Sequence, residues 1–412
     1  MTGGETPVLR RQWWAWAVAA VVVAWAVAPL VLHWLTNPDD QRLVDLDVYR
    51  TGGQMLLDGR AVYDFSTPAP QLLPFTYPPV AAMLAVALAE MSWGTAQWVW
   101  TAGIFVALAV TVGYSFRKAL VGALGKHGPW VFAFLMVACT YVMPIRDQVR
   151  FGQVDIMLVA LCLADCVARR PWWPRGFLIG VATAVKLTPG VFLVYLLVTR
   201  QWRTLFMASF VTGLLTLLPF AVIPRDAAGF WFSALLDPER LGSNAGTTNQ
   251  SVRGMLIRLY LNDTLTSVLW VAVVAVVAWY GFRAAREAYR ADDHVTAVAL
   301  VGLMAVLLSP VAWIHHLAWV VVVLGALVGD GRDPVRLRVA AGVWLYYVLP
   351  IPWWGVSLKA AEIPVLSPVL GKIVQNGYGL GALALVWLLA AWLPKRRAAE
   401  PSPGALAAHY PR

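Results

Sequence analysis

The chain has 412 residues, of which 60% are hydrophobic and 13% are charged. Soluble domains carry roughly a quarter charged residues, so this composition excludes an ordinary soluble enzyme and indicates an all-α, polytopic helical membrane protein. The net charge of +10 does not indicate a nucleic-acid partner, because the arginines cluster between apolar runs as cytoplasmic anchors do. The three cysteines lie inside apolar segments and predict neither a disulfide framework nor a metal site.

Apolar runs recur along the whole chain and predict about eleven to thirteen membrane segments, beginning with residues 13–35. Arg10 and Arg11 precede the first run, so the positive-inside bias predicts a cytoplasmic N-terminus and an external loop at 36–76. Within that loop, residues 46–57 have the spacing of an amphipathic helix that lies along the membrane surface.

Two later segments are not simple spans. The run 77–91 is short, and we expect it to be re-entrant, because a crossing would put the basic segment around Arg117 outside. Residues 177–199 lie between two basic turns and are interrupted by Lys186 and Pro189, which favours two half-helices over one span. On this topology the polar clusters without a structural explanation fall on the outer side. We predict one membrane domain over 1–395, with its site facing the periplasm or cell exterior, and a disordered cytoplasmic tail over 396–412.

The first candidate site is the stretch 45–50 in the first outer loop, which contains Asp45 and Asp47. A partly desolvated carboxylate here could accept a proton from an attacking sugar hydroxyl. Asp45 could instead cap the helix 46–57 by accepting amide hydrogens. Both readings remain open from the residues alone.

His315 and His316 follow Trp313 at a predicted membrane boundary. A single boundary histidine is often an interfacial anchor, whereas a pair favours contact with a phosphate or a sugar hydroxyl. Adjacent histidines point in divergent directions and no close Cys, Asp or Glu set accompanies them, so we do not expect a metal site.

Four cations are candidates for binding a phosphate. Arg146 and Arg150 are four residues apart, Lys186 is the only lysine inside an apolar run, and Arg253 follows 249–251. An intramembrane cation predicts an anionic partner, and a lipid phosphate would satisfy it. The alternative is a set of structural ion pairs with carboxylates along the chain (Asp147, Asp155 and Asp165).

Eight short motifs follow one another along the chain in a specific order. They stand at 45–49, 57–59 with 62–63, 75–79, 151–155, 175–176 with Gly180, 186–189, 249–251, and 309–310 with 315–316. In this order and spacing they resemble glycosyltransferase family 87, a GT-C superfamily group of actinobacterial polyprenol-phosphate-mannose-dependent mannosyltransferases. The resemblance covers roughly residues 13–395.

The resemblance implies a GT-C fold and a mannosyltransferase that uses polyprenyl-phosphate-mannose as donor. It implies a glycolipid acceptor, either a phosphatidylinositol mannoside or lipomannan, and an α-1,2 linkage formed by inversion on the outer face of the cell membrane. The essential aspartate of the family's first outer loop matches Asp45, and Asp47 is the second choice. Membrane lipid is the remaining expected partner.

On this interpretation the candidate catalytic residues are Asp45, Asp47, His315 and His316. The candidate substrate-binding residues are Tyr49, Tyr77, Arg146, Arg150, Gln153, Asp155, Lys186, Asn249, Gln250 and Arg253. Because lysine or arginine charge can replace a metal at a monophosphate, we expect no cofactor and no metal. The rival hypothesis is a multi-pass transporter or flippase of a lipid-linked sugar, which would explain the broken segment at Lys186 equally well. It does not explain why the polar clusters gather on one face.

Overall fold

Helices make up the regular structure in this computed structural model, which describes residues 13–38, 41–122, 127–237, 240 and 242–398. Within those ranges the strand-like pairing is limited to two isolated antiparallel bridges, Ser66 with Pro74 and Asn249 with Trp313. The predicted all-α class is confirmed.

The first half of the chain contains α2 (Trp13–Thr36), α3 (Val44–Leu57), α4 (Pro79–Ala89), α5 (Trp93–Ser115), α6 (Arg117–Gly122), α7 (Gly128–Thr140), α8 (Met143–Phe151), α9 (Asp155–Val167), α10 (Phe177–Val185), α11 (Val191–Val198) and α12 (Trp202–Val222). The second half contains α13 (Pro224–Phe232), α14 (Val252–Ile257), α15 (Asp263–Arg290), α16 (His294–Leu307), α17 (Val320–Val328), α18 (Pro334–Val348), α19 (Ile351–Ala360), α20 (Leu366–Gln375), α21 (Gly377–Trp387) and α22 (Leu393–Ala398). Short 3-10 turns lie at Val62–Asp64, Thr188–Gly190, Ala234–Leu236 and Ile314–Trp319.

Five of these helical stretches are long and apolar enough to cross a membrane, and the number rises to seven if each bent helix pair is one span. The bent pairs are α7 with α8, at 74°, and α18 with α19, at 51°. Four shorter apolar helices, of 10–17 residues, lie between them, and the eleven to thirteen segments expected from the sequence included such short ones. The chain is a multi-pass membrane protein.

The centre of the bundle is formed by α16 and α17, whose residues are almost all buried. By contrast, α12 and α15 expose many apolar side chains, as expected for helices that face lipid rather than protein. The close approach of α17 to α5 depends on Gly325, where a Cβ would lie 2.6 Å from the backbone oxygen of Ser115.

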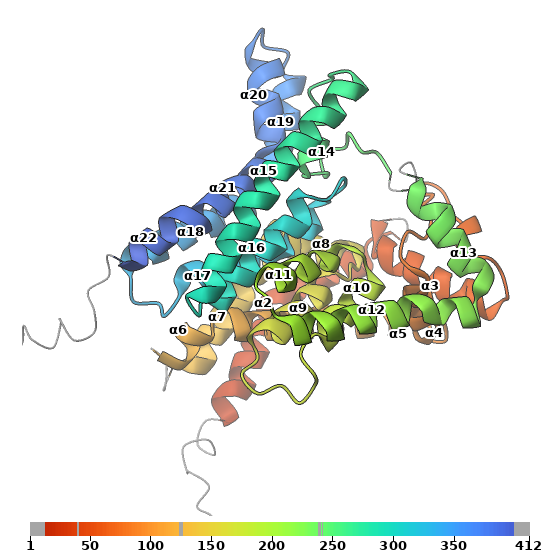
Figure 1. Cartoon of the computed structure of the whole chain (residues 1–412), viewed down its shortest axis with the longest axis horizontal. Helices are drawn as coiled ribbons and strands as arrows, with labels where there is room; N and C mark the ends of the chain where they lie inside the picture. Colours follow the sequence, from red (N-terminus) through yellow and green to blue (C-terminus); the bar gives the residue numbers. More distant parts are fainter. Residues whose placement is uncertain (1–12, 39–40, 123–126, 238–239, 241, 399–412) are drawn as a thin grey trace, which may run out of the picture.

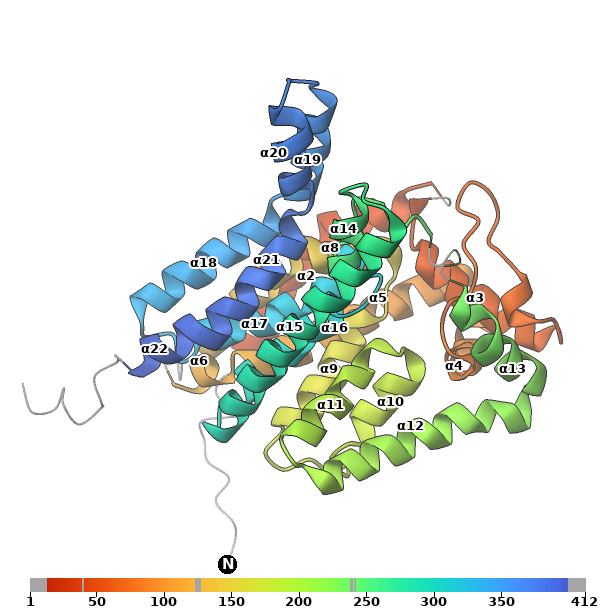
Figure 2. The same cartoon turned by 45° about the horizontal axis from the view of Figure 1, so that its top comes forward.

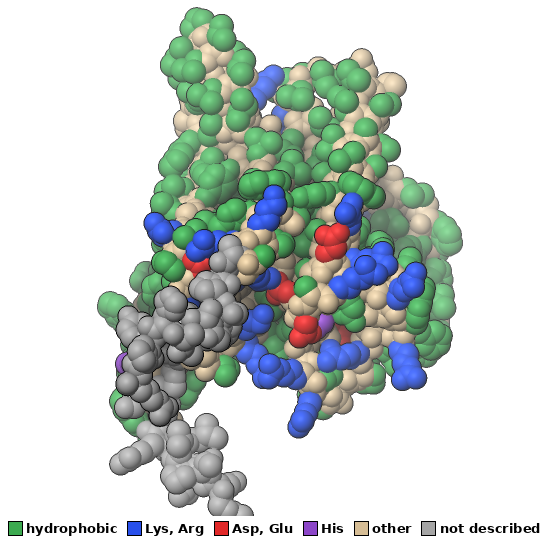
Figure 3. Space-filling view, turned by 60° about the vertical axis from the view of Figure 1, so that its left-hand side comes forward, with side chains coloured by type: hydrophobic (Ala, Val, Ile, Leu, Met, Phe, Trp, Pro, Cys, Tyr) green, Lys and Arg blue, Asp and Glu red, His purple; other side chains and the backbone are tan. Residues whose placement is uncertain are grey.

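Three of the shorter helices gather at one end of the molecule. In Figures 1 and 2, α3, α4 and α13 lie together near the right-hand end of α12, while the α19–α20 hairpin projects from the body at another place. On the face in Figure 3, Lys and Arg side chains gather in the lower part, beneath a mainly hydrophobic surface.

Several sequence expectations can be compared with these bounds. The interruption of 177–199 is confirmed, because α10 ends at Val185 and α11 begins at Val191. The run 77–91 forms the short helix α4, and whether it is re-entrant stays a prediction. Of the tail expected over 396–412, the first three residues belong to α22, which continues to Ala398, and residues 399–412 lie outside the described residues.

Two ion pairs explain why the helix continues past residue 395. Arg396 Nε lies 2.7 Å from Asp333 Oδ2, and Arg397 pairs with Asp293. These contacts fasten α22 to the loop before α18 and to the N-terminus of α16.

Candidate active site

A cavity of about 930 Å³ opens where the segment between α2 and α4, the break between α10 and α11, and the segment before α17 meet. The charged and polar side chains of its wall include Asp45, Asp147, Gln153, Lys186, His315 and His316. Segments more than a hundred residues apart in the chain thus contribute to one wall.

Asp45 lies in the first turn of α3, at the second residue of the helix. The N-cap is Leu43, which makes no side-chain capping hydrogen bond, so the alternative reading of Asp45 as the helix cap is wrong. Burial raises the pKa of Asp45 to about 7, while a hydrogen bond from Gln153 and the charge of Lys186 oppose that rise. The carboxyl group therefore titrates close to neutral pH.

The end of α8 holds α3 in place beside the cavity. Gly152 has a φ of 70° and ends α8, and a Cβ at this residue would lie 2.8 Å from the Cβ of Leu46. The backbone N–H of Leu43 donates to the Arg150 carbonyl at 3.0 Å. Gln153 and Asp155 follow Gly152 directly in the chain. The turn at Gly152 therefore positions both the helix that bears Asp45 and the segment that bears Asp155.

Lys186 occupies the break between α10 and α11 with an extended backbone. Pro189 lacks an N–H to continue the helix, which favours a break at this point. The Lys186 Nζ lies 2.7 Å from Asp155 Oδ1, 3.0 Å from His316 Nε2 and 3.4 Å from the Tyr77 hydroxyl. The sequence expectation that Lys186 has an anionic partner is confirmed, and the partner is Asp155.

A tyrosine pair joins the lysine to the aspartate of α3. The hydroxyl oxygens of Tyr49 and Tyr77 are 2.8 Å apart, and Gln153 Oε1 accepts hydrogen bonds from them at 3.1 and 3.2 Å. Since the other end of the Gln153 amide bonds to Asp45, a continuous polar network runs from Asp45 to Lys186.

The two histidines lie on the 3-10 turn Ile314–Trp319. The Nε2 atoms of His315 and His316 each lie 3.8 Å from Asp155 Oδ2, and the His315 carbonyl accepts from Gln148 Nε2 at 2.8 Å. The expectation that no carboxylate accompanies the histidines is therefore wrong, because Asp155 is distant only in sequence.

Asp155, His315 and His316 offer ligand atoms within 4.8 Å of one another, a spacing that could hold a metal ion. The ammonium of Lys186 contacts two of these three groups, Asp155 and His316, and brings a positive charge to the same place. Metal independence stays a prediction.

The candidates that do not line this cavity include Asp47 and three arginines. Asp47 lies on another face of α3 from Asp45, and Arg146 flanks Asp147 on α8. The Arg150 guanidinium carbon lies 5.0 Å from the Trp34 ring and 4.8 Å from the Phe151 ring. Arg253 lies 5.6 Å from the Trp270 ring. The expected convergence of all four cations on one phosphate is therefore not observed; Lys186 alone among them reaches the cavity wall.

Asn249 and Gln250 are fully buried and make structural contacts instead. Asn249 Oδ1 accepts from the backbone N–H groups of Ala312 and Ser251, at 3.0 and 3.2 Å. Gln250 Nε2 donates to two carbonyls, and its Oε1 accepts from the Gly379 N–H at 2.8 Å. Direct substrate contact by these amides is not what the geometry indicates, because their hydrogen-bonding capacity is used within the protein.

Two lining residues were missed as candidates. Asp147 is buried and faces the cavity, but in the sequence it stands between two arginines and resembled an ion-pair partner. Arg240 also lines the cavity and donates to the Tyr63 carbonyl at 2.9 Å. Its sequence surroundings, a long outer loop, carried no signal.

Comparison with known proteins identifies the family. The sequence profile of glycosyltransferase family 87 matches residues 75–310. A polyprenol-phosphate-mannose-dependent α-(1-2)-phosphatidylinositol mannoside mannosyltransferase of Mycolicibacterium smegmatis is 36% identical over 336 residues, covering 75% of this chain and 76% of that protein. A polyprenol-phosphate-mannose-dependent α-(1-2)-phosphatidylinositol pentamannoside mannosyltransferase of the same species is 31% identical, covering 77% of each.

Among solved structures, ArnT from Cupriavidus metallidurans bound to undecaprenyl phosphate is similar over 93% of this chain and 77% of that chain, with 17% identity and a TM-score of 0.42. The extent of the sequence match decides the family. The chain belongs to glycosyltransferase family 87 and is a glycosyltransferase.

Proposed function

We propose that this protein transfers mannose from polyprenyl-phosphate-mannose to a phosphatidylinositol mannoside and forms an α-1,2 linkage. The donor and acceptor classes come from the names of the relatives that are 31–36% identical. The observation that carries the proposal is the polar network in one cavity that joins the carboxyl group of Asp45 to the ammonium of Lys186.

Asp45 is the proposed general base. Transfer to a sugar hydroxyl requires an acceptor for its proton, and a base works best when its pKa is near the working pH. Burial raises the pKa of Asp45 to about 7, which meets that condition. Gln153 donates to the carboxyl group and orients it.

Lys186 is the proposed cation for the departing polyprenyl phosphate. Charge develops on the phosphate as the bond to the sugar breaks, and a fixed ammonium stabilises it. His316, at 3.0 Å from Lys186 Nζ, is placed to contact the same phosphate. Arg240 provides a further cation on the cavity wall.

A single displacement explains the expected stereochemistry. Attack of the acceptor hydroxyl on the anomeric carbon, opposite the leaving phosphate, inverts that carbon, so a β-linked mannosyl phosphate gives an α product. One base is sufficient for this step, and Asp147 is not required to take a second proton.

We propose that the cavity faces the outer side of the cell membrane. The support is the separation between the polar outer loops around the cavity and the basic turns elsewhere, part of which is visible on the face in Figure 3.

The deciding experiment is a transfer assay with purified protein in detergent. Radiolabelled polyprenyl-phosphate-mannose is supplied with defined phosphatidylinositol mannosides or with lipomannan, and the product linkage is determined by digestion with an α-1,2-specific mannosidase. We expect labelled product with a phosphatidylinositol mannoside. Movement of the lipid across vesicles with no transfer would support the transporter hypothesis instead.

A further inference from the structure

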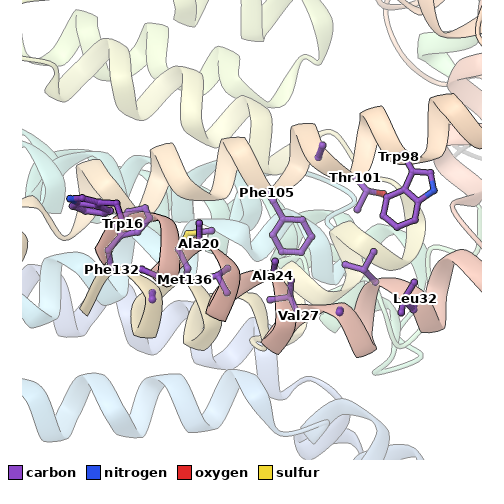
Figure 4. A pocket seen from close by; sticks show the side chains of 16 residues that line it. Trp16, Ala20, Ala24, Val27, Leu32, Trp98, Thr101, Phe105, Phe132 and Met136 are labelled. Atoms are coloured by element: carbon purple, nitrogen blue, oxygen red, sulfur yellow. The ribbon is translucent and has the colours of Figure 1, made fainter. Parts of the chain in front are cut away.

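An apolar groove lies between α2, α5 and α7 and has a volume of about 500 Å³. On α2 its lining extends from Trp16 to Leu32 (Figure 4). The sixteen helical rises between these two residues correspond to about 24 Å, which is long enough for an extended hydrocarbon chain.

The wall that α2 contributes to the groove is built largely from small residues. Ala20, Ala24 and Ala28 stand four residues apart on one face of the helix and line the groove. Figure 4 shows Phe105 on the α5 side facing this row, with Trp16 at one end of the groove and Leu32 at the other.

Unused hydrogen-bond donors gather at the Leu32 end. Thr101, which is 3% exposed, lines the groove and its hydroxyl has no hydrogen-bond partner among the residues described. Gln97, one helical turn away on α5 and 7% exposed, leaves its Nε2 unpaired. The Trp34 Nε1 and the Arg150 Nε are likewise unpaired within the described ranges. Four buried donors at one end of an apolar groove indicate a ligand with acceptor oxygens, because an unsatisfied buried donor costs about 1–3 kcal/mol.

The chemistry of these donors selects the occupant. An isoprenoid chain has no oxygen to accept hydrogen bonds along its length, whereas a glycerophospholipid has ester carbonyls and a phosphodiester where its acyl chains begin. We propose that the groove binds an acyl chain of the acceptor's phosphatidyl anchor, with Thr101 and Gln97 at the ester level and Arg150 at the phosphodiester. This inference rests on the proposed function, because it assumes that the acceptor is a phosphatidyl glycolipid.

The position of the groove fits an acceptor rather than a donor. The Arg150 guanidinium lies between the rings of Trp34 and Phe151, and Phe151 lines the cavity that contains Asp45. A headgroup that starts at Arg150 passes Phe151 and reaches the base on the side of the cavity formed by α3 and α8. Trp100, whose indole donates to the Gly152 carbonyl at 2.7 Å, fixes α5 against this passage.

The test fills the groove and compares two acceptors. Ala24→Trp places an indole in the middle of the groove, and Val21→Trp adds the same ring at a position of α2 that is 67% exposed and outside the lining. Each variant is assayed with a diacylated phosphatidylinositol mannoside and with its deacylated, water-soluble form. For Ala24→Trp we expect KM of the diacylated acceptor to rise about tenfold or more, with unchanged donor KM and unchanged activity on the deacylated form. Val21→Trp should match the wild type.

Arg150→Gln tests the polar end of the groove. It should raise KM of the diacylated acceptor by about tenfold or more, the size of a lost hydrogen bond to a charged group. A rise in donor KM for either variant would assign the groove to the isoprenoid chain and overturn the proposal. Equal effects of Ala24→Trp on the two acceptors would overturn it as well. Arg150→Gln should instead affect both acceptors, because the deacylated form keeps the phosphodiester.

A binding measurement covers the case in which Ala24→Trp does not fold. A phosphatidylinositol mannoside with a diazirine on its acyl chain should label peptides of α2 and α5 in the wild-type protein, and unlabelled acceptor should compete. Equal competition by phosphatidylcholine would show that the groove holds bulk lipid. Wild-type protein that transfers to neither acceptor would refute the proposed function, and the labelling result would then decide the groove separately.

Discussion

Two buried polar clusters lie on either side of the segment before α17, and their hydrogen bonding differs. The cavity cluster consists of Asp45, Asp155, Lys186, His315 and His316. The amide cluster consists of Asn249, Gln250, Arg258, Gln375 and Asn376. In the cavity cluster, Asp155 Oδ2 and His315 Nε2 are buried without a hydrogen-bond partner in the described part of the chain.

In the amide cluster, by comparison, the side chains use their hydrogen-bonding capacity within the protein. Arg258, 2% exposed, donates to the Asn376 side chain at 2.7 Å and to the carbonyls of Gly246 and Asn249 at 2.6 and 2.7 Å. Asn249 in turn bonds to the backbone of Ala312, next to the histidine turn. Satisfied buried groups stabilise one arrangement, whereas unsatisfied groups beside a cavity are available to a ligand. The comparison teaches that burial and polarity alone do not identify a binding site; unused hydrogen-bonding capacity does.

The largest expected effect is that of Asp45→Asn. Loss of a general base lowers the rate by about a hundred- to ten-thousand-fold, and asparagine keeps the size of the side chain. The transfer rate is measured alongside donor binding, which should persist. Asp47→Asn is the control and should be much milder, because Asp47 does not line the cavity.

The stability of Asp45→Asn separates catalysis from folding. A carboxyl group whose pKa is raised in the fold holds its proton there but loses it in the unfolded chain, so its contribution to stability falls as pH rises from about 4 to about 7. Asparagine does not titrate, so the variant does not lose stability in this way as pH rises. Thermal unfolding at pH 8 should therefore show a variant at least as stable as the wild type; a clearly less stable one would assign Asp45 a structural role.

The second effect is that of Lys186→Met, which removes the ammonium but keeps an apolar side chain of similar length. Loss of a charged contact to a phosphate should weaken donor binding by about 1.5–3 kcal/mol, roughly ten- to a hundred-fold. Binding of radiolabelled donor measures this directly. Unchanged donor affinity would remove Lys186 from the phosphate site.

Asn249→Ala should lower the stability of the protein and leave donor binding unchanged, the opposite of what we expect for Lys186→Met. It leaves the buried N–H groups of Ala312 and Ser251 without their acceptor, at a cost of about 1–3 kcal/mol in the free energy of unfolding. We expect a lower unfolding temperature in detergent, with donor affinity close to that of the wild type. A normal unfolding temperature combined with lost donor binding would place Asn249 in the substrate site after all.

The pH profile provides a smaller, graded effect. Because the pKa of Asp45 is raised to about 7, the carboxyl group is protonated and inactive as a base at lower pH. The value of kcat/KM should fall about tenfold for each pH unit below that pKa. Constant activity from pH 5 to 8 would contradict the assignment.

Arg253→Ala should have the smallest effect. Its guanidinium lies against Trp270 and away from the cavity, and a cation–π contact contributes about 0.5–1 kcal/mol at exposed sites. Donor affinity should stay within about twofold of the wild-type value on that basis. A tenfold loss would restore the sequence-based expectation that Arg253 binds the donor phosphate.

Much of the fold and part of the site could be predicted from the sequence. Lys186 stood out because a lysine in an apolar run is costly without a partner. The structure has both the expected helix break at Lys186 and an anionic partner, the carboxylate of Asp155. Asp155 was one of three carboxylates that the sequence offered as ion-pair partners. It could not be singled out, since it lies 31 residues before Lys186 and 161 before His316, and only packing brings the three together.

Other candidates lie where the sequence could not place them. Arg150 lies outside the cavity wall, because the rings of Trp34 and Phe151 flank its guanidinium, and sequence spacing does not reveal those contacts. Asn249 and Gln250 resembled site residues because polar motifs in outer loops often bind ligands, and their saturation depends on backbone atoms far along the chain. Asp147 was hidden by its neighbours, since charge alone does not tell which face of α8 turns toward the cavity.

Gly152 places a mechanical limit on the site. It ends α8 in a left-handed conformation and leaves no room for a methyl group against Leu46, the residue after Asp45. Proton transfer requires heavy atoms within about 2.6–3.2 Å, so an ångström of displacement of α3 would exceed the working tolerance. Gly152 therefore sets the distance between α3, which bears the base Asp45, and the segment with Asp155, which pairs with Lys186. It can do so because glycine has a hydrogen atom where every other amino acid has a Cβ carbon.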